Sequence, residues 1–297
     1  MDPVLGEVLT AIVTPFDKDG AVDYDRFRAL ARYVIDNGAD GLVVAATTGE
    51  SPTLTDDEKV QLWTAAVDEV GERATVIAST GTYATAHSVH LTEQAHELGV
   101  DGLLVVTPYY NKPQPRGIVE HFKAIAGASD KPIVVYNIPQ RVVINIEPET
   151  MIELAEIPTV KAVKQATEEI EQARRIVDET DLDLYAGSDN LVYPFLDIGG
   201  VGGVVVHGNL IPGRVKEMIA FYKEGEIEAA RDIDEELAPL VNALGVSINP
   251  VPVKAALNLL GHDVGGVRLP LVEATAEEIE AVRSALERVG LNAPVSA

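Results

Sequence analysis

The chain contains no cysteine among its 297 residues. Disulfide bonds, thiolate nucleophiles and cysteine-ligated metal or iron–sulfur sites are therefore excluded. Long apolar runs are also missing, because no stretch approaches the ~18 apolar residues that span a membrane. The N-terminal residues lack the basic start and apolar run of a signal peptide. We therefore expect a soluble, cytoplasmic protein with no membrane partner.

Basic residues are scarce. The 23 lysines and arginines stand against 47 aspartates and glutamates, which gives a formal net charge of −24. So acidic a surface disfavours nucleic acid and anionic membranes as partners. The acidic residues are spread through the predicted helices and do not form a tail. The excess is typical either of a salty cytoplasm or of an ordinary acidic bacterial protein.

Several motifs of other enzyme classes are absent. His87, His90 and His96 recur at helical spacing without an H-E-x-x-H pattern, so they are expected on a helix surface. The Gly-Ser-Asp at 187–189 is not a G-x-S-x-G nucleophile elbow. The glycine-rich stretch 199–203 precedes a predicted strand and does not open a helix, which disfavours phosphate binding. We therefore predict neither a metal site nor a cofactor.

Short apolar runs alternate with helical patterns through about residue 210. Several are continuous, which is typical of parallel strands covered on both faces. Eight strand–helix units favour a closed (β/α)₈ TIM barrel over an open doubly wound sheet, and no G-x-G-x-x-G follows the first run. The predicted strands are residues 9–14, 41–47, 74–80, 102–107, 132–138, 160–166, 183–187 and 202–207.

The pattern becomes purely helical after the eighth predicted strand. We therefore expect a catalytic barrel at residues 1–224 and a C-terminal helical extension at 225–297, packed on the barrel. Local signals support the helix boundaries, since Thr55 to Glu58 reads as a capping box. The helices predicted here are residues 212–224, 226–243, 250–261 and 275–290.

Lys164 is the most informative residue, because it lies inside a predicted buried strand. Side chains alternate along a strand, so Lys161 points the opposite way, while Ala162 and Ala166 leave room beside Lys164. A buried ammonium is costly unless it is paired or loses its proton, and a neutral amine attacks carbonyl carbon. The alternative is a lysine at a strand end that reaches solvent.

Other polar residues follow strands at the face where barrel enzymes carry their active sites. Thr47 and Thr48 supply hydroxyls suited to a small carboxylate, or stabilise a loop. Tyr136, on the same face as Val134, can transfer protons or fill the core. Arg141, in the predicted loop beyond, can clamp a carboxylate or lie on the surface.

The paired tyrosines Tyr109 and Tyr110, between prolines, suit a subunit contact or a phenol near the site. Taken together, the strand-end groups fit a keto acid: an amine that condenses with the ketone, hydroxyls for the carboxylate and a tyrosine for proton transfer. No residue in the set suits hydride or phosphoryl transfer.

From about residue 5 to residue 291, the chain resembles the dihydrodipicolinate synthase / N-acetylneuraminate lyase family of pyruvate-dependent class I aldolases. The resemblance rests on five motifs in the same order and spacing. They are Thr47-Thr48-Gly49-Glu50-Ser51, Thr107-Pro108-Tyr109-Tyr110-Asn111, Tyr136-Asn137-Ile138-Pro139, Val163-Lys164-Gln165-Ala166-Thr167 and Asn249-Pro250-Val251-Pro252-Val253-Lys254.

The resemblance implies a role for each matching residue. Lys164 would form the imine with pyruvate, and Tyr136 would donate and accept the proton. Thr47 would link Tyr136 to Tyr110, which would enter from a neighbouring subunit of a homotetramer built as a dimer of tight dimers. Pyruvate's carboxylate would be held by Thr48 with help from the backbone near Val204.

Arg141 discriminates within the family, because synthases carry an arginine there for the carboxylate of aspartate semialdehyde, while sugar-acid aldolases and sialic acid lyases typically lack it. The resemblance therefore implies a lyase that condenses pyruvate with L-aspartate 4-semialdehyde to give 4-hydroxy-tetrahydrodipicolinate, in lysine and diaminopimelate biosynthesis. The alternatives are an aldolase for 2-keto-3-deoxy sugar acids and, in another class, a catalytically silent barrel that senses a keto acid. The four retained catalytic residues argue against the silent barrel.

The chain departs from the family pattern at several positions. Val142 stands where synthases usually carry Thr or Ser, Gln165 where Glu or Asp is common, and Ala45-Ala46 replaces a glycine-containing pair. His207 occupies a usually small position in the predicted eighth strand. These departures bear on which second substrate is used and leave the imine chemistry unaffected.

Feedback by lysine is predicted to be weak or absent. In regulated relatives, side chains at five positions bind the inhibitor lysine. Of the residues at those positions in this chain, only Tyr109 is the same as in the regulated relatives. The four that differ are Asp56, Lys59, Tyr83 and His87.

Overall fold

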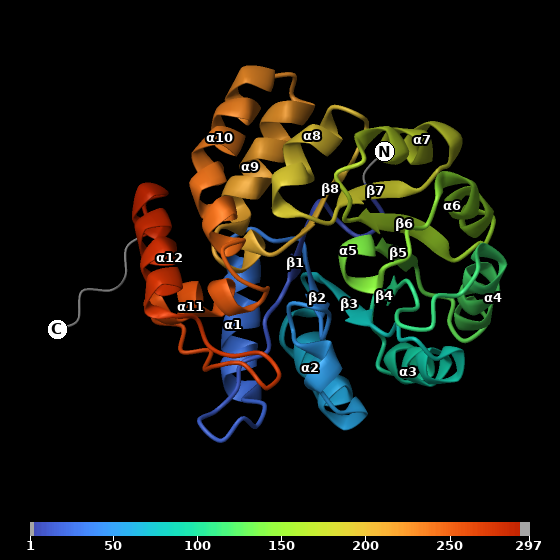
Figure 1. The fold of residues 1–297 in the computed structure, drawn as a ribbon, viewed down its shortest axis with the longest axis horizontal. Coiled ribbons are helices and arrows are strands. Elements are labelled where there is room, and N and C mark those ends of the chain that lie inside the picture. Colours follow the sequence, from blue (N-terminus) through green and yellow to red (C-terminus); the bar gives the residue numbers. More distant parts are fainter. Residues whose placement is uncertain (1–2, 292–297) are drawn as a thin grey trace.

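The structure, a computed structural model, describes residues 3–291. Eight parallel strands follow one another around a closed barrel, and the eighth pairs with the first (Figure 1). The predicted (β/α)₈ fold is confirmed, and each strand ends one to three residues before its predicted end, where the chain turns into a loop. The strands are β1 (Val8–Ala11), β2 (Gly41–Val44), β3 (Thr75–Ser79), β4 (Gly102–Val106), β5 (Ile133–Asn137), β6 (Val160–Gln165), β7 (Asp183–Ala186) and β8 (Gly202–Val205).

Helices surround the barrel on its outside (Figure 1). The predicted capping box at Thr55 is present, with its hydroxyl accepting from the Glu58 N–H and the Glu58 carboxylate accepting from the Thr55 N–H. These helices are α1 (Tyr24–Asp36), α2 (Asp56–Val70), α3 (Thr85–Glu97), α4 (Pro115–Ala126), α6 (Pro148–Ala155), α7 (Ile170–Glu179), α8 (Val192–Leu196) and α9 (Pro212–Lys223). The short helix α5 (Pro139–Val142) follows β5 and lies inside this ring (Figure 1).

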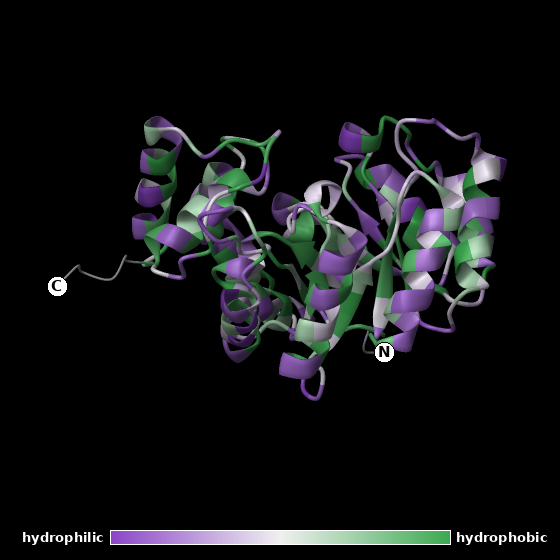
Figure 2. Cartoon of the chain, turned by 90° about the horizontal axis from the view of Figure 1, so that it is seen from below, coloured by the Kyte–Doolittle hydropathy of each residue, from purple (hydrophilic) through white to green (hydrophobic). Residues whose placement is uncertain are grey.

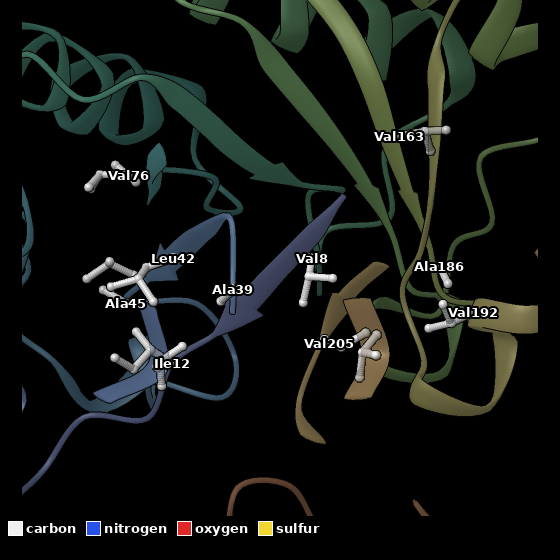
Figure 3. Close-up of a cluster of buried hydrophobic side chains, with 14 of the residues drawn as sticks. Val8, Ile12, Ala39, Leu42, Ala45, Val76, Val163, Ala186, Val192 and Val205 are labelled. Atoms are coloured by element: carbon white, nitrogen blue, oxygen red, sulfur yellow. The ribbon is translucent and has the colours of Figure 1, made fainter. Parts of the chain in front are cut away.

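The strands bury side chains on both faces. In β2, Val43 belongs to the cluster inside the barrel, whereas Leu42 and Val44 pack in the cluster between strands and helices. Figure 3 shows part of the outer cluster, including Val163 of β6 and Ala186 of β7. Figure 2 shows the hydrophobic strands at the centre and hydrophilic outer faces on the helices. This double burial explains the continuous apolar runs of the sequence.

The C-terminal extension consists of α10 (Ile227–Leu244), α11 (Val251–Leu259) and α12 (Ala276–Arg288), close to their predicted bounds. Helix α10 lies alongside α9 and also touches two short 3₁₀ helices of the barrel, η2 (Asp189–Leu191) and η3 (His207–Asn209). Helix α12 packs on α10 and α11 and lies farthest from the barrel (Figure 1). The division of the chain at residue 224 stays a prediction. Across residues 3–291, no helix is both long and apolar enough to cross a bilayer.

Buried charges join the extension to the barrel. The Lys254 amine of α11 donates to Glu50 Oε1 and to the Thr14 carbonyl, each at 2.9 Å. The other oxygen of Glu50 accepts from the Arg268 N–H at 2.9 Å, and the Arg268 guanidinium forms a two-point ion pair with Glu58 at the start of α2. These contacts fix the loop after β2, which leads into the candidate site.

Candidate active site

Lys164 points into the barrel, as strand alternation predicts. It is 4% exposed, and its neighbours Ala162 and Ala166 belong to the inner cluster, whereas Lys161 is exposed. The register of β5 and β6 places Tyr136 directly opposite Lys164, and the Lys164 Nζ lies 4.3 Å from the centroid of the Tyr136 ring. The two residues predicted to share the chemistry are therefore in contact.

The Lys164 amine has no carboxylate partner among residues 3–291, and it faces the ring of Tyr136. A ring face attracts a cation but accepts no proton from it. The nitrogen is therefore not tied into an ion pair. Lys164 does not itself line the adjoining cavity, but Tyr136, whose ring it faces, does.

That cavity, of about 380 Å³, opens at the carboxyl ends of β2 to β5, the face where TIM barrels carry their active sites. It brings together three of the predicted site residues, Thr47, Tyr136 and Arg141. Its full lining is Thr47, Ser51, Pro52, Leu54, Asp56, Lys59, Ser79, Gly81, Thr82, Tyr83, His87, Val106, Tyr109, Tyr136, Ile138, Arg141 and Val142.

Thr48 and Arg141 are bridged by a residue of the extension. The Asn249 side-chain amide donates to Thr48 Oγ1 at 3.0 Å, and the Asn249 carbonyl accepts from the Arg141 guanidinium at 3.4 Å. Thr48 is 2% exposed, and its Oγ1 is the acceptor in this bond, which holds the oxygen in place. Sequence reasoning quoted the motif that begins at Asn249 but assigned it no role.

The prediction that Arg141 lies in a loop is wrong. It lies in the four-residue helix α5, because Pro139 supplies a favourable first helical position directly after β5. Its side chain is exposed and lines the cavity. The following Val142, the last residue of that helix, is buried, so an apolar side chain replaces the hydroxyl that synthases usually carry there.

Gln165, the other departure beside Lys164, is buried in an amide network. Its Oε1 accepts from the Asn137 amide at 3.2 Å, and its Nε2 donates to Thr167 Oγ1 at 3.2 Å. A neutral glutamine can both donate and accept at this position, whereas an ionised carboxylate only accepts. The residue therefore joins the ends of β5 and β6 without adding a charge next to Lys164.

Tyr110 does not join the other catalytic candidates within one chain. It is 91% exposed, and its backbone φ of 69° lies in the left-handed region that a bulky residue rarely adopts. Its neighbour Tyr109 lines the cavity and packs edge-on against Tyr83, with ring centroids 5.3 Å apart. A role for Tyr110 in catalysis therefore requires a second copy of the chain.

Val204 is buried in the inner cluster on β8, next to β1. His207 was predicted to lie in this strand, and that is wrong, because β8 ends at Val205 and His207 begins the helix η3. Two backbone N–H groups beyond the strand bond to Asp189, which turns the chain out of the ladder. The sequence analysis considered residues 187–189 only as a possible nucleophile elbow and assigned Asp189 no role.

The residues that bear on lysine feedback all line the cavity. Burial lowers the pKa of Lys59, and the carboxylate of Asp56 at 3.9 Å opposes that shift. His87 Nε2 lies 2.8 Å from the other Asp56 oxygen. This end of the cavity therefore presents cationic or neutral groups around one engaged carboxylate. In the described part of the chain, no group of three or more possible metal ligands is found.

Comparison with known proteins gives the family. The model of the dihydrodipicolinate synthetase family matches residues 4–289. The 4-hydroxy-tetrahydrodipicolinate synthase of Moorella thermoacetica is 48% identical over 288 residues, covering 96% of this chain and 99% of that protein. A crystal structure of DHDPS from Cyanidioschyzon merolae with lysine bound has a TM-score of 0.96 and 42% identity, covering 98% of this chain and 100% of that one. Dihydrodipicolinate synthase from Thermotoga maritima has a TM-score of 0.94 and 40% identity, over 97% and 99% of the two chains. The chain belongs to the dihydrodipicolinate synthetase family.

Proposed function

We propose that the chain is a 4-hydroxy-tetrahydrodipicolinate synthase, a lyase that condenses pyruvate with L-aspartate 4-semialdehyde on the route to lysine and diaminopimelate. The observation that carries the proposal is the buried Lys164 amine against the Tyr136 ring, beside a cavity that Arg141 lines. Four relatives that are 46–48% identical to this chain, over 96–97% of its length, are named 4-hydroxy-tetrahydrodipicolinate synthase.

The chemistry begins with attack of the Lys164 amine on the ketone carbon of pyruvate. Loss of water gives an imine, and loss of a methyl proton gives an enamine. The enamine carbon attacks the aldehyde of the second substrate. The amino group of that substrate then attacks the imine carbon, closes the ring and releases Lys164 as a free amine. Tyr136 moves the protons in these steps.

Two carboxylates need binding sites, one on each substrate. Thr48, with backbone groups near Val204, holds the pyruvate carboxylate, and Arg141 holds that of the semialdehyde. Asn249 supports both assignments, since it bonds to Thr48 and to Arg141. The arginine favours the semialdehyde over a neutral sugar aldehyde, which carries no matching charge.

The working enzyme is a homotetramer, a dimer of tight dimers in the cytoplasm. Thr47 links Tyr136 to Tyr110 of the neighbouring subunit in a proton path. The exposure of Tyr110 in the single chain supports this assembly, because a phenol used for proton transfer must reach the site from elsewhere. The finding that Thr47 and Tyr136 line one cavity supports the near end of the path.

A paired-substrate assay tests the proposal. With pyruvate present, we expect turnover of aspartate semialdehyde and little turnover of glyceraldehyde. Arg141→Ala should raise KM for the semialdehyde ~10- to 100-fold, the range for losing a charged hydrogen-bonded contact, and should leave imine formation with pyruvate intact. Faster turnover of glyceraldehyde than of the semialdehyde would favour the sugar-acid aldolase instead.

Lysine feedback is tested in the same assay. The carboxylate that faces this end of the cavity, Asp56, is already engaged by His87 and Lys59, so it is poorly available to a second ammonium group. We expect sub-millimolar lysine to leave the steady-state rate unchanged. Inhibition in that range would contradict this prediction without affecting the proposed reaction.

A further inference from the structure

We propose that Asp189 and His207 are positioning residues for the pyruvate carboxylate, acting through the backbone at the end of β8. The inference rests on the proposed function, in which backbone groups near Val204 hold that carboxylate. Neither residue lines the cavity. Their contribution is therefore to the geometry of the binding groups.

Asp189 holds the chain directly after β8. One carboxylate oxygen accepts from the Val206 N–H at 2.7 Å, and the other accepts from the His207 N–H at 2.8 Å. The side chain is only 8% exposed, so water is a poor substitute for either bond. Val206 lies two residues beyond Val204 in the chain and directly after the end of β8, so this clamp adjoins the proposed binding groups.

His207 completes the pair from the other side. Its side chain is 2% exposed, and its Nδ1 lies 3.2 Å from Asp189 Oδ2. Burial raises the pKa of Asp189, but the neighbouring His207 and the hydrogen bonds from the two backbone N–H groups outweigh burial, so that the pKa falls below its usual range. Asp189 is therefore an ionised acceptor at neutral pH, able to take both backbone bonds at once.

A second amide fixes the opposite side of the same turn. Asn209 donates to the carbonyls of Ala11 at 2.8 Å and Val206 at 2.9 Å, and its Oδ1 accepts from the Val13 N–H at 3.2 Å. The turn between β8 and η3 is thus tied to β1 by Asn209 and to η2 by Asp189. Loss of the Asp189 clamp leaves the β1 side in place, which favours a local displacement over unfolding.

The experiment compares Asp189→Asn with a matched control, Asp40→Asn. Asp40 Oδ2 also accepts two backbone N–H bonds, from Glu7 and Val8 at 3.0 Å each, but at the start of β1, the end of the barrel away from the cavity. An asparagine in place of Asp189 keeps one carbonyl oxygen and turns an N–H₂ group toward a backbone N–H. Each full-length variant is assayed over a range of pyruvate concentrations and is then reduced with borohydride in the presence of pyruvate to trap the imine.

We expect Asp189→Asn to raise KM for pyruvate about tenfold and to change kcat less than about threefold, because binding geometry is lost while Lys164 and Tyr136 remain. Asp40→Asn should leave KM within about twofold of the parent. His207→Gln, which keeps the carboxylate clamp, should raise KM less than Asp189→Asn, and it replaces that variant if Asp189→Asn does not fold.

An unchanged KM in the folded Asp189 or His207 variant overturns the inference, as does an equal rise in Asp40→Asn. These outcomes are distinct from failure of the proposed function. If the parent itself forms no trapped adduct with pyruvate, the proposed function fails. If the parent is trapped and the variants bind pyruvate as the parent does, only the positioning role fails.

Discussion

Two buried lysines of this molecule, Lys164 and Lys254, have similar burial and different surroundings. They are 4% and 2% exposed, and their amines lie 4.3 Å and 4.2 Å above the rings of Tyr136 and Phe16. Lys254 also donates to Glu50 and to a backbone carbonyl, whereas Lys164 has no carboxylate partner within residues 3–291. The comparison teaches that the partners of a buried lysine, more than its burial, separate a reactive amine from a structural one.

The position of the Lys254–Glu50 ion pair also indicates a structural role. Burial lowers the pKa of Lys254, and the neighbouring Glu50 opposes this shift through its charge and hydrogen bond. Glu50 lies just after the two threonines of the β2 loop, and its backbone φ of 59° is left-handed. The pair therefore holds the loop that presents Thr47 and Thr48 to the site.

Removal of the Lys164 amine should produce the largest effect. Lys164→Ala should lower kcat at least ~10³-fold, because no imine can form without the amine. Its unfolding free energy should equal or exceed that of the parent, since the variant no longer buries an amine without an anion. Steady-state assays and urea unfolding of the same preparation measure both quantities. Near-normal turnover in the folded variant would show that Lys164 is not the reactive amine, and the contrast with the structural Lys254 would be lost.

Removal of the Lys254 amine should act on stability instead. Lys254→Met leaves the Glu50 carboxylate buried without its cation, which typically costs about 3–5 kcal/mol of unfolding free energy. The folded fraction should still form the pyruvate imine at Lys164. Urea unfolding measures the loss, and borohydride trapping measures the retained chemistry.

The double variant Lys254→Met with Glu50→Gln sharpens this test. Removing both charges leaves no unpaired buried ion, so the double variant should be more stable than Lys254→Met alone. If the double variant loses as much unfolding free energy as Lys254→Met and Glu50→Gln lose in sum, the buried pair does not act as a unit. If Lys254→Met abolishes trapping while the protein remains folded, Lys254 takes part in the chemistry and the comparison fails.

The smallest effect concerns the partly buried Arg268–Glu58 ion pair of the same network. The hydrogen bond from Arg268 is the largest of the effects that hold the pKa of Glu58 below its ordinary value of 4.5. Because the folded-state pKa is depressed, this stabilisation is present above pH ~4.5, the unfolded value, and is lost as the pH falls through the folded-state value. Urea midpoints from pH 6 to pH 3 should fall less steeply in Glu58→Gln than in the parent. Parallel curves would show that the pair contributes no pH-dependent stability.

Local periodicity accounts for what the sequence predicts correctly. The alternation of β6 and β5 predicts that Lys164 and Tyr136 point into one barrel, and eight repeating units predict closure. The Lys254–Glu50 pair spans 204 residues and the Asn249–Thr48 bond 201, so no spacing rule joins their members. Arg141 was misplaced because a four-residue helix is too short for a periodic pattern.

Borohydride reduction of the enzyme with pyruvate, followed by peptide mass spectrometry, tests the central claim most directly. The account predicts one reduced pyruvate adduct, on Lys164 and not on the equally buried Lys254, and no adduct in Lys164→Ala. An adduct on Lys254, or turnover with aspartate semialdehyde in the absence of any adduct on Lys164, would contradict it.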